Sequence, residues 1–79
     1  MKELLEKILA EIKKTPGGMT AYEDLYHICI ETKKTDAGLA VKYLKLLSDC
    51  IERQIPAVDS DRDLHFLFNL HKKVLLAAA

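Results

Sequence analysis

Residues 39–55 carry two apolar stripes side by side, and this feature limits the folds open to the chain. Side chains recur there at intervals of three and four, as on one face of an α-helix. The first stripe comprises Ala40, Val41, Leu44, Leu47, Ser48, Ile51 and Ile55, and the second comprises Leu39, Tyr43, Leu46 and Cys50. An apolar arc this wide exceeds what a surface helix needs. We therefore expect a central helix that contacts neighbours on more than one side.

Two helices are predicted before the central one. Residues 2–14 consist of strong helix formers with a regular apolar face, and Thr15-Pro16-Gly17-Gly18 ends that helix. Residues 20–32 begin with Thr20-Ala21-Tyr22-Glu23, which fits a capping box, since the threonine and glutamate side chains can bind free backbone amides. The central helix itself is predicted over residues 36–54.

Local signals mark both ends of the central helix. Thr35 or Asp36 can cap its first turn, because a short oxygen-bearing side chain accepts a hydrogen bond from a free amide there. Pro56 predicts a stop at Gln54 or Ile55, because proline pushes the preceding residue out of the helical region.

The segment after Pro56 supports two interpretations. Ser60-Asp61-Arg62-Asp63 fits a second capping box, and late cations suit the negative end of a helix over residues 61–77. The alternation of apolar side chains over residues 64–70 is instead a strand pattern. We prefer the helix, since caps and charges agree with it. Its face would hold Leu64, Leu67, Phe68, His71 and Leu75, with Phe66, Leu70 and Val74 beside it.

Four helices joined by short loops predict an all-α, up-down four-helix bundle that forms one domain over residues 1–79. Loop shortness makes sequential helices antiparallel, so lysines from three of them gather at one end. This basic pole comprises Lys33, Lys34, Lys42, Lys45, Lys72 and Lys73. Complementarity to helix dipoles explains much of this sorting. The basic pole is also the candidate surface for an acidic protein partner.

If residues 64–70 formed a strand, the chain would resemble a winged helix-turn-helix domain. Gly18-Met19-Thr20 would be a short first strand leading into the second helix, and residues 59–63 would be the wing tip. The central helix, with Val41, Leu44, Leu47 and Ile51, would be the recognition helix.

This resemblance implies binding of nucleic acid, with Thr35, Lys42 and Lys45 toward DNA and Arg62 on the wing. Two features of the chain oppose it. Twelve basic and twelve acidic residues cancel, and three aspartates at the wing tip would repel phosphate.

No catalytic, metal-binding or cofactor-binding constellation stands out. Asp24-x-x-His27 occurs once, whereas carboxylate-bridged metal sites use such a motif on two helices. Cys29 and Cys50 lie in apolar helical patterns and are predicted to be buried free thiols, which suits a reducing compartment. No signal peptide or membrane-length apolar run is visible, so a cytoplasmic location is expected.

These observations predict a non-enzymatic protein-interaction module, with a protein partner or self-association favoured over nucleic acid. No membrane contact, small-molecule substrate or cofactor is expected. The regularity of residues 2–14 also leaves open an engineered scaffold without native activity.

Overall fold

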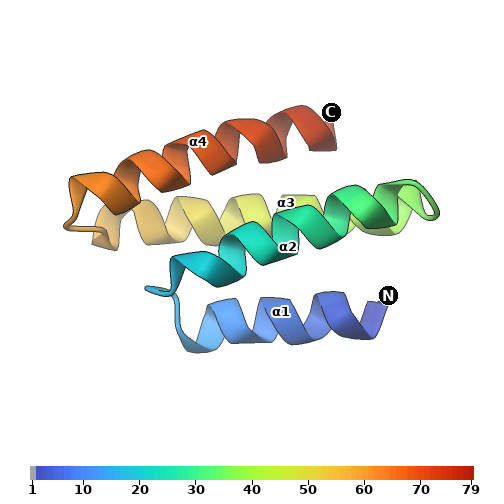
Figure 1. The fold of residues 1–79 in the computed structure, drawn as a ribbon, viewed down its shortest axis with the longest axis horizontal. Coiled ribbons are helices and arrows are strands. Elements are labelled where there is room, and N and C mark those ends of the chain that lie inside the picture. The colour runs from blue at the N-terminus through green and yellow to red at the C-terminus, as the bar shows by residue number, and fades with distance from the viewer. Residues whose placement is uncertain (1) are drawn as a thin grey trace.

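The computed structural model describes residues 2–79 and contains four α-helices (Figure 1). They are α1 (Lys2–Lys14), α2 (Met19–Lys33), α3 (Ala37–Gln54) and α4 (Asp61–Ala78), with a short 3-10 helix, η1 (Ile55–Ala57), between α3 and α4. These residues contain no strand. The predicted all-α four-helix bundle is confirmed.

The helices run alternately up and down, and α2 and α3 form the central pair (Figure 1). Helix α1 packs mainly on α2, whereas α4 packs mainly on α3, so these two lie on opposite edges. The bundle is flattened, with extents of 37 × 24 × 15 Å. Helix α3 packs against all three other helices, as its two apolar stripes predict. Among residues 2–79, no other helix packs on the outer sides of α1 and α4.

All four α-helices contribute to one continuous hydrophobic core. Leu44, Leu47 and Ile51 of α3 are completely buried, and each contributes about 2 kcal/mol through burial of its side chain. The largest fully buried apolar side chains on the other helices are Leu5, Ile12, Tyr22, Leu25, Leu67 and Val74.

Two of the three predicted caps are present. The Asp36 side chain accepts a hydrogen bond from the Leu39 amide at 3.1 Å, and Ser60 Oγ accepts one from the Asp63 amide at 3.4 Å. The predicted Thr20 cap is wrong, because α2 begins at Met19. Gly18 occupies the N-cap position in an extended conformation, and Thr20 already lies inside the first turn.

The strand interpretation of residues 64–70 is wrong, because this segment lies within α4. The buried residues Leu67, Leu70 and Val74 are spaced by three and four, which only a helix places on one side. A strand would have buried Phe68, which is 42% exposed. Without strands in residues 2–79, the winged-helix alternative fails: Gly18-Met19-Thr20 forms no strand and no wing exists for Arg62.

Candidate functional site

The basic pole lies where the end of α2, the first half of α3 and the end of α4 meet (Figure 1). All six of its lysines are exposed. One contact joins two of the helices directly, because Lys33 Nζ donates a hydrogen bond to the Ala77 carbonyl at 2.7 Å. That carbonyl is among the last four of α4, which have no partner within the helix. Lys33 therefore stabilises the fold as well as adding positive charge.

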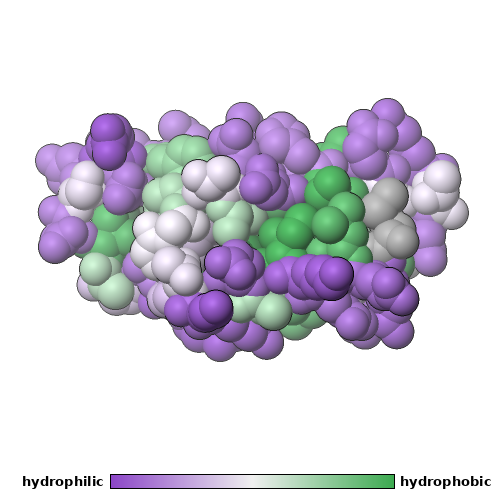
Figure 2. Space-filling model, turned by 60° about the horizontal axis from the view of Figure 1, so that its bottom comes forward, coloured by the Kyte–Doolittle hydropathy of each residue, from purple (hydrophilic) through white to green (hydrophobic). Residues whose placement is uncertain are grey.

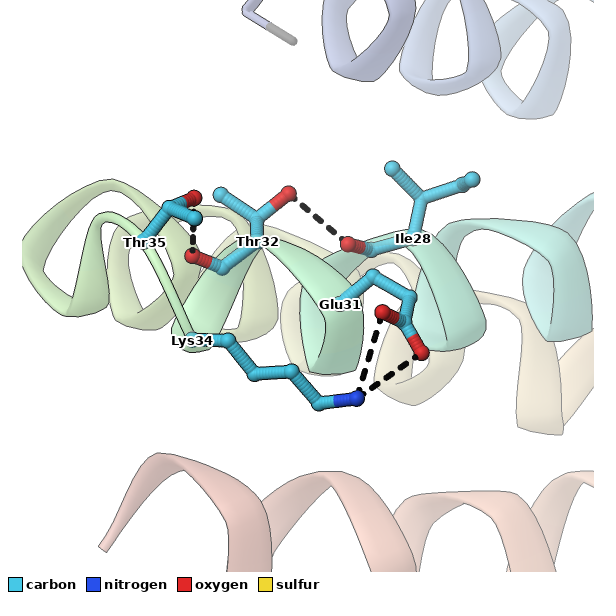
Figure 3. Close-up of polar contacts among 5 residues, drawn as sticks. All are labelled: Ile28, Glu31, Thr32, Lys34 and Thr35. Carbon is cyan, nitrogen blue, oxygen red and sulfur yellow. Dashed lines mark hydrogen bonds and ion pairs between the residues drawn. The ribbon is translucent and has the colours of Figure 1, made fainter.

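Two other lysines of the pole also have partners within the chain. Figure 3 shows Lys34 reaching back to Glu31, whose two carboxylate oxygens both lie 3.3 Å from Nζ. Lys42 Nζ lies 5.9 Å from the centre of the Tyr43 ring, within the range of a cation–π contact. Within residues 2–79, Lys45, Lys72 and Lys73 form no ion pair. Of the six lysines in the basic pole, these three have neither a hydrogen bond, an ion pair nor a cation–π contact within the part of the chain that the structure describes.

The C-terminal end of α2 contains a buried polar side chain that is fully satisfied. Thr32 is completely buried, and its Oγ1 donates a hydrogen bond to the Ile28 carbonyl at 2.8 Å (Figure 3). The Thr32 carbonyl in turn accepts from the Asp36 amide at 2.7 Å and from Thr35 Oγ1 at 3.3 Å. This network fixes the turn that leads into α3, so Thr32 is structural.

Helix α4 presents large apolar side chains to solvent along the edge of the bundle. Phe68, Leu75 and Leu76 are 42%, 52% and 78% exposed. Phe68 and Leu75 are seven residues apart and so lie on the same side, two turns from each other. We define the outer face of α4 by its exposed residues Asp61, His65, Phe68, Lys72, Leu75 and Leu76.

Sequence reasoning missed this surface because it assigned Phe68 and Leu75 to the packed face of α4. The packed face is centred instead on Leu67, Leu70 and Val74. The sequence did contain an indication of this exposed surface, because α4 has more apolar side chains than one side of a helix can bury. On the opposite edge, Figure 2 shows an apolar patch near the N-terminal end of α1. Leu4, 43% exposed, is the large exposed apolar residue of α1.

A serine, a histidine and a glutamate meet between α3 and α4. Ser48 Oγ lies 3.0 Å from His71 Nε2, and Glu52 Oε1 lies 3.8 Å from the same nitrogen. In a catalytic triad the hydroxyl and the carboxylate bind different nitrogens of the ring, so that the base is oriented by the acid. This geometry does not match that arrangement. The contact instead joins α4 to α3 beside the core.

Both cysteines are buried free thiols, as predicted. Burial raises the pKa of Cys29 to about 11, so its thiol stays protonated at neutral pH. Since the thiolate is the nucleophile, Cys29 is chemically inert in the folded protein. Exposed His27 of the Asp24-x-x-His27 motif lies beside Glu23 instead: its Nε2 is 3.8 Å from Glu23 Oε1, one turn earlier on α2.

No protein-family model matches the chain, and neither a curated protein nor a solved structure shows significant similarity to it. Within residues 2–79, every helix is too short or too polar to cross a membrane. The exposed surfaces of the bundle are therefore the features that bear on its function.

Proposed function

We propose that the chain is a non-enzymatic protein-interaction module that associates with a second copy of itself through the outer face of α4. The supporting observation is the exposure of Phe68, Leu75 and Leu76 on a helix that lies at the edge of the bundle. Clustered exposed apolar side chains of this kind mark association surfaces, because their burial removes apolar area from water.

The charges of the outer face are self-complementary in one orientation. Its N-terminal part carries Asp61, and its C-terminal part carries Lys72. If two α4 helices pair antiparallel about a point between residues 66 and 67, each Asp61 lies opposite Lys72 of the other copy. The two Phe68 side chains then lie near the centre. Leu75 and Leu76 lie past the start of the other α4, opposite residues 57–58 of that copy. A parallel pair would instead place like charges together.

This arrangement is a two-fold symmetric interface, in which the same surface of each copy meets its counterpart. Neither Asp61 nor Lys72 has an ion-pair partner within residues 2–79, so both are available. Three of the six lysines in the basic pole already have contacts within the chain. Fewer of them are therefore free to bind an acidic protein through charge alone. An acidic protein bound at the basic pole would also contact Lys72. Binding of such a protein in place of self-association is the competing outcome of the test below.

The test is sedimentation equilibrium over a range of protein concentrations. We expect the apparent mass to rise from that of one chain to that of two. Phe68→Gln should shift the transition to at least about tenfold higher concentration, because it removes roughly 1.4 kcal/mol or more of apolar contact. Leu4→Gln is the matched control, since Leu4 is equally exposed on the opposite edge and should have no effect.

A charge swap tests the orientation. Asp61→Lys and Lys72→Glu should each weaken self-association, because each places like charges opposite one another. The double variant Asp61→Lys/Lys72→Glu should restore it. A single-chain mass at every concentration would refute the proposal and redirect the search to an acidic partner. Failure of the double variant to restore association would refute the antiparallel pairing.

A further inference from the structure

Helices α1 and α2 pack antiparallel and present a joint surface along one side of the bundle. Residues spaced by three and four lie on one side of a helix, so each helix contributes one row of side chains to it. We define this α1–α2 surface by Leu4, Ile8, Glu11 and Thr15 of α1 and by Ala21, Asp24 and Ile28 of α2. None of these residues belongs to α4, so self-association through the outer face of α4 leaves the surface open.

One half of the α1–α2 surface is apolar. Leu4 is 43% exposed, and Ile8 and Ile28 are partly exposed. Because the two helices run antiparallel, Ile28 near the end of α2 lies toward Leu4 at the start of α1. Figure 2 shows an apolar patch near the N-terminal end of α1, with hydrophilic side chains around it. This half therefore offers apolar area that a partner can still remove from water.

The other half of the α1–α2 surface is acidic and surrounds a hollow of about 290 Å³. The hollow is lined by Glu11, Thr15, Gly18, Thr20, Ala21 and Asp24. All of these lining residues are exposed or partly exposed, so a bound group can touch them. Neither Glu11 nor Asp24 forms an ion pair with any residue from 2 to 79, although Lys7 lies one turn before Glu11. The two carboxylates are thus available to a cation from outside the chain.

The order of the two halves specifies the chemistry of the occupant. Leu4 and Glu11 are seven residues apart, which is about 10 Å along α1. A partner helix that lies along this surface covers the same distance in two turns. Its apolar and basic side chains must therefore lie on one side, about seven residues apart. Nucleic acid and anionic membranes do not fit, because their phosphates are repelled by Glu11 and Asp24.

From this complementarity we infer that the α1–α2 surface binds a basic amphipathic helix of a partner protein. Apolar side chains of that helix cover Leu4, Ile8 and Ile28, and a lysine enters the hollow between Glu11 and Asp24. The aliphatic stem of a lysine packs on apolar surface while its ammonium group reaches a carboxylate. The surface is separate from the outer face of α4, so this inference does not depend on self-association.

The experiment uses a fluorescein-labelled amphipathic peptide of about 14 residues, with leucines over its first two turns and lysines over the next turns of the same side. Its fluorescence anisotropy is measured with increasing protein at about 0.15 M salt, where distant charges are screened. We expect saturable binding. The same peptide with glutamate in place of each lysine should bind at least about tenfold more weakly, because like charges then meet.

A substitution in the apolar half tests the contact with leucine. Leu4→Gln should weaken binding of the lysine peptide at least about fivefold, because it removes apolar area that the peptide covers. Phe68→Gln is the matched control, since Phe68 is similarly exposed on α4 and lies outside the α1–α2 surface. It should leave the affinity unchanged.

A charge reversal tests the acidic half. Glu11→Lys/Asp24→Lys should weaken binding at least about tenfold, because attraction is replaced by repulsion. Glu6→Lys/Asp49→Lys makes the same change in net charge at exposed positions outside the surface and should alter the affinity by less than about twofold. The circular dichroism of each variant establishes that it is folded.

Several results would overturn the inference. They are no saturable binding, equal binding of the glutamate peptide, or unchanged affinity in either Leu4→Gln or Glu11→Lys/Asp24→Lys. An equal loss in Phe68→Gln would also overturn it, because the peptide would then lie on α4. Loss of self-association in Leu4→Gln would assign the α1–α2 surface to a second copy of the chain and would likewise overturn it.

Discussion

Alkaline pH is expected to destabilise the bundle through Cys29. Burial raises the pKa of this thiol from 9.0 to about 11 in the folded protein. The folded state therefore holds the thiol proton more tightly than the unfolded state does. The contribution of the Cys29 thiol to the free energy of unfolding is fully present below pH 9, and it is lost as the pH rises through 11. At 1.36 kcal/mol per pKa unit, Cys29 alone should reduce the free energy of unfolding by about 2 kcal/mol at pH 11.

Urea unfolding at pH 8 and pH 11, under reducing conditions, measures this loss, and Cys29→Ala is the control. The variant should be less stable at pH 8, because it leaves a cavity, yet lose about 2 kcal/mol less between the two pH values. Burial also raises the pKa of Tyr22 and Tyr43 in both proteins, and the charge of Cys29 contributes to the shift of Tyr43. The difference therefore measures Cys29 together with its coupling to Tyr43. Equal losses in both proteins would refute the reasoning.

Two further predictions concern stability. Leu47→Ala should lower the free energy of unfolding by about 3 kcal/mol, because Leu47 is completely buried. Leu76→Ala, at a position 78% exposed, should change the free energy of unfolding of the single chain by less than about 0.5 kcal/mol. Urea denaturation of both variants checks this, at a protein concentration too low for self-association. Asp36→Ala should lower the free energy of unfolding by about 1 kcal/mol, because it removes the cap on α3. Thr20→Ala should lower it much less, because Thr20 lies inside the first turn of α2. Similar thermal unfolding temperatures for these two variants would contradict the cap assignment.

Much of the fold follows from the sequence because several signals coincide within each helix. The two stripes of residues 39–55 predict a helix with several neighbours, and α3 packs against the other three. Asp36 and Ser60 cap as their spacing predicts, because a cap depends only on nearby backbone. The predicted Thr20 cap is absent because the extended residue before α2 is Gly18, so the helix begins at Met19 and already includes Thr20.

The candidate surfaces were harder to predict, because they depend on contacts between helices. Periodicity shows that α4 has an apolar side but does not show which of two adjacent stripes packs on α3. The sequence likewise does not show that Lys33 binds the Ala77 carbonyl, 44 residues away. A hollow at the other end of the bundle takes Ile12 from α1, Tyr22 from α2 and Arg53 from α3, and these residues share no local spacing.

The packing order of the helices also has a kinetic consequence. The most extensive contacts join helices that follow one another in the chain: α1 with α2, α2 with α3, and α3 with α4. Loops that close such contacts are short, so little chain entropy is lost before packing begins. Helical bundles with contacts this local fold within roughly microseconds to milliseconds. We expect the same here, with the edge helices α1 and α4 exchanging their amide hydrogens sooner than the central pair.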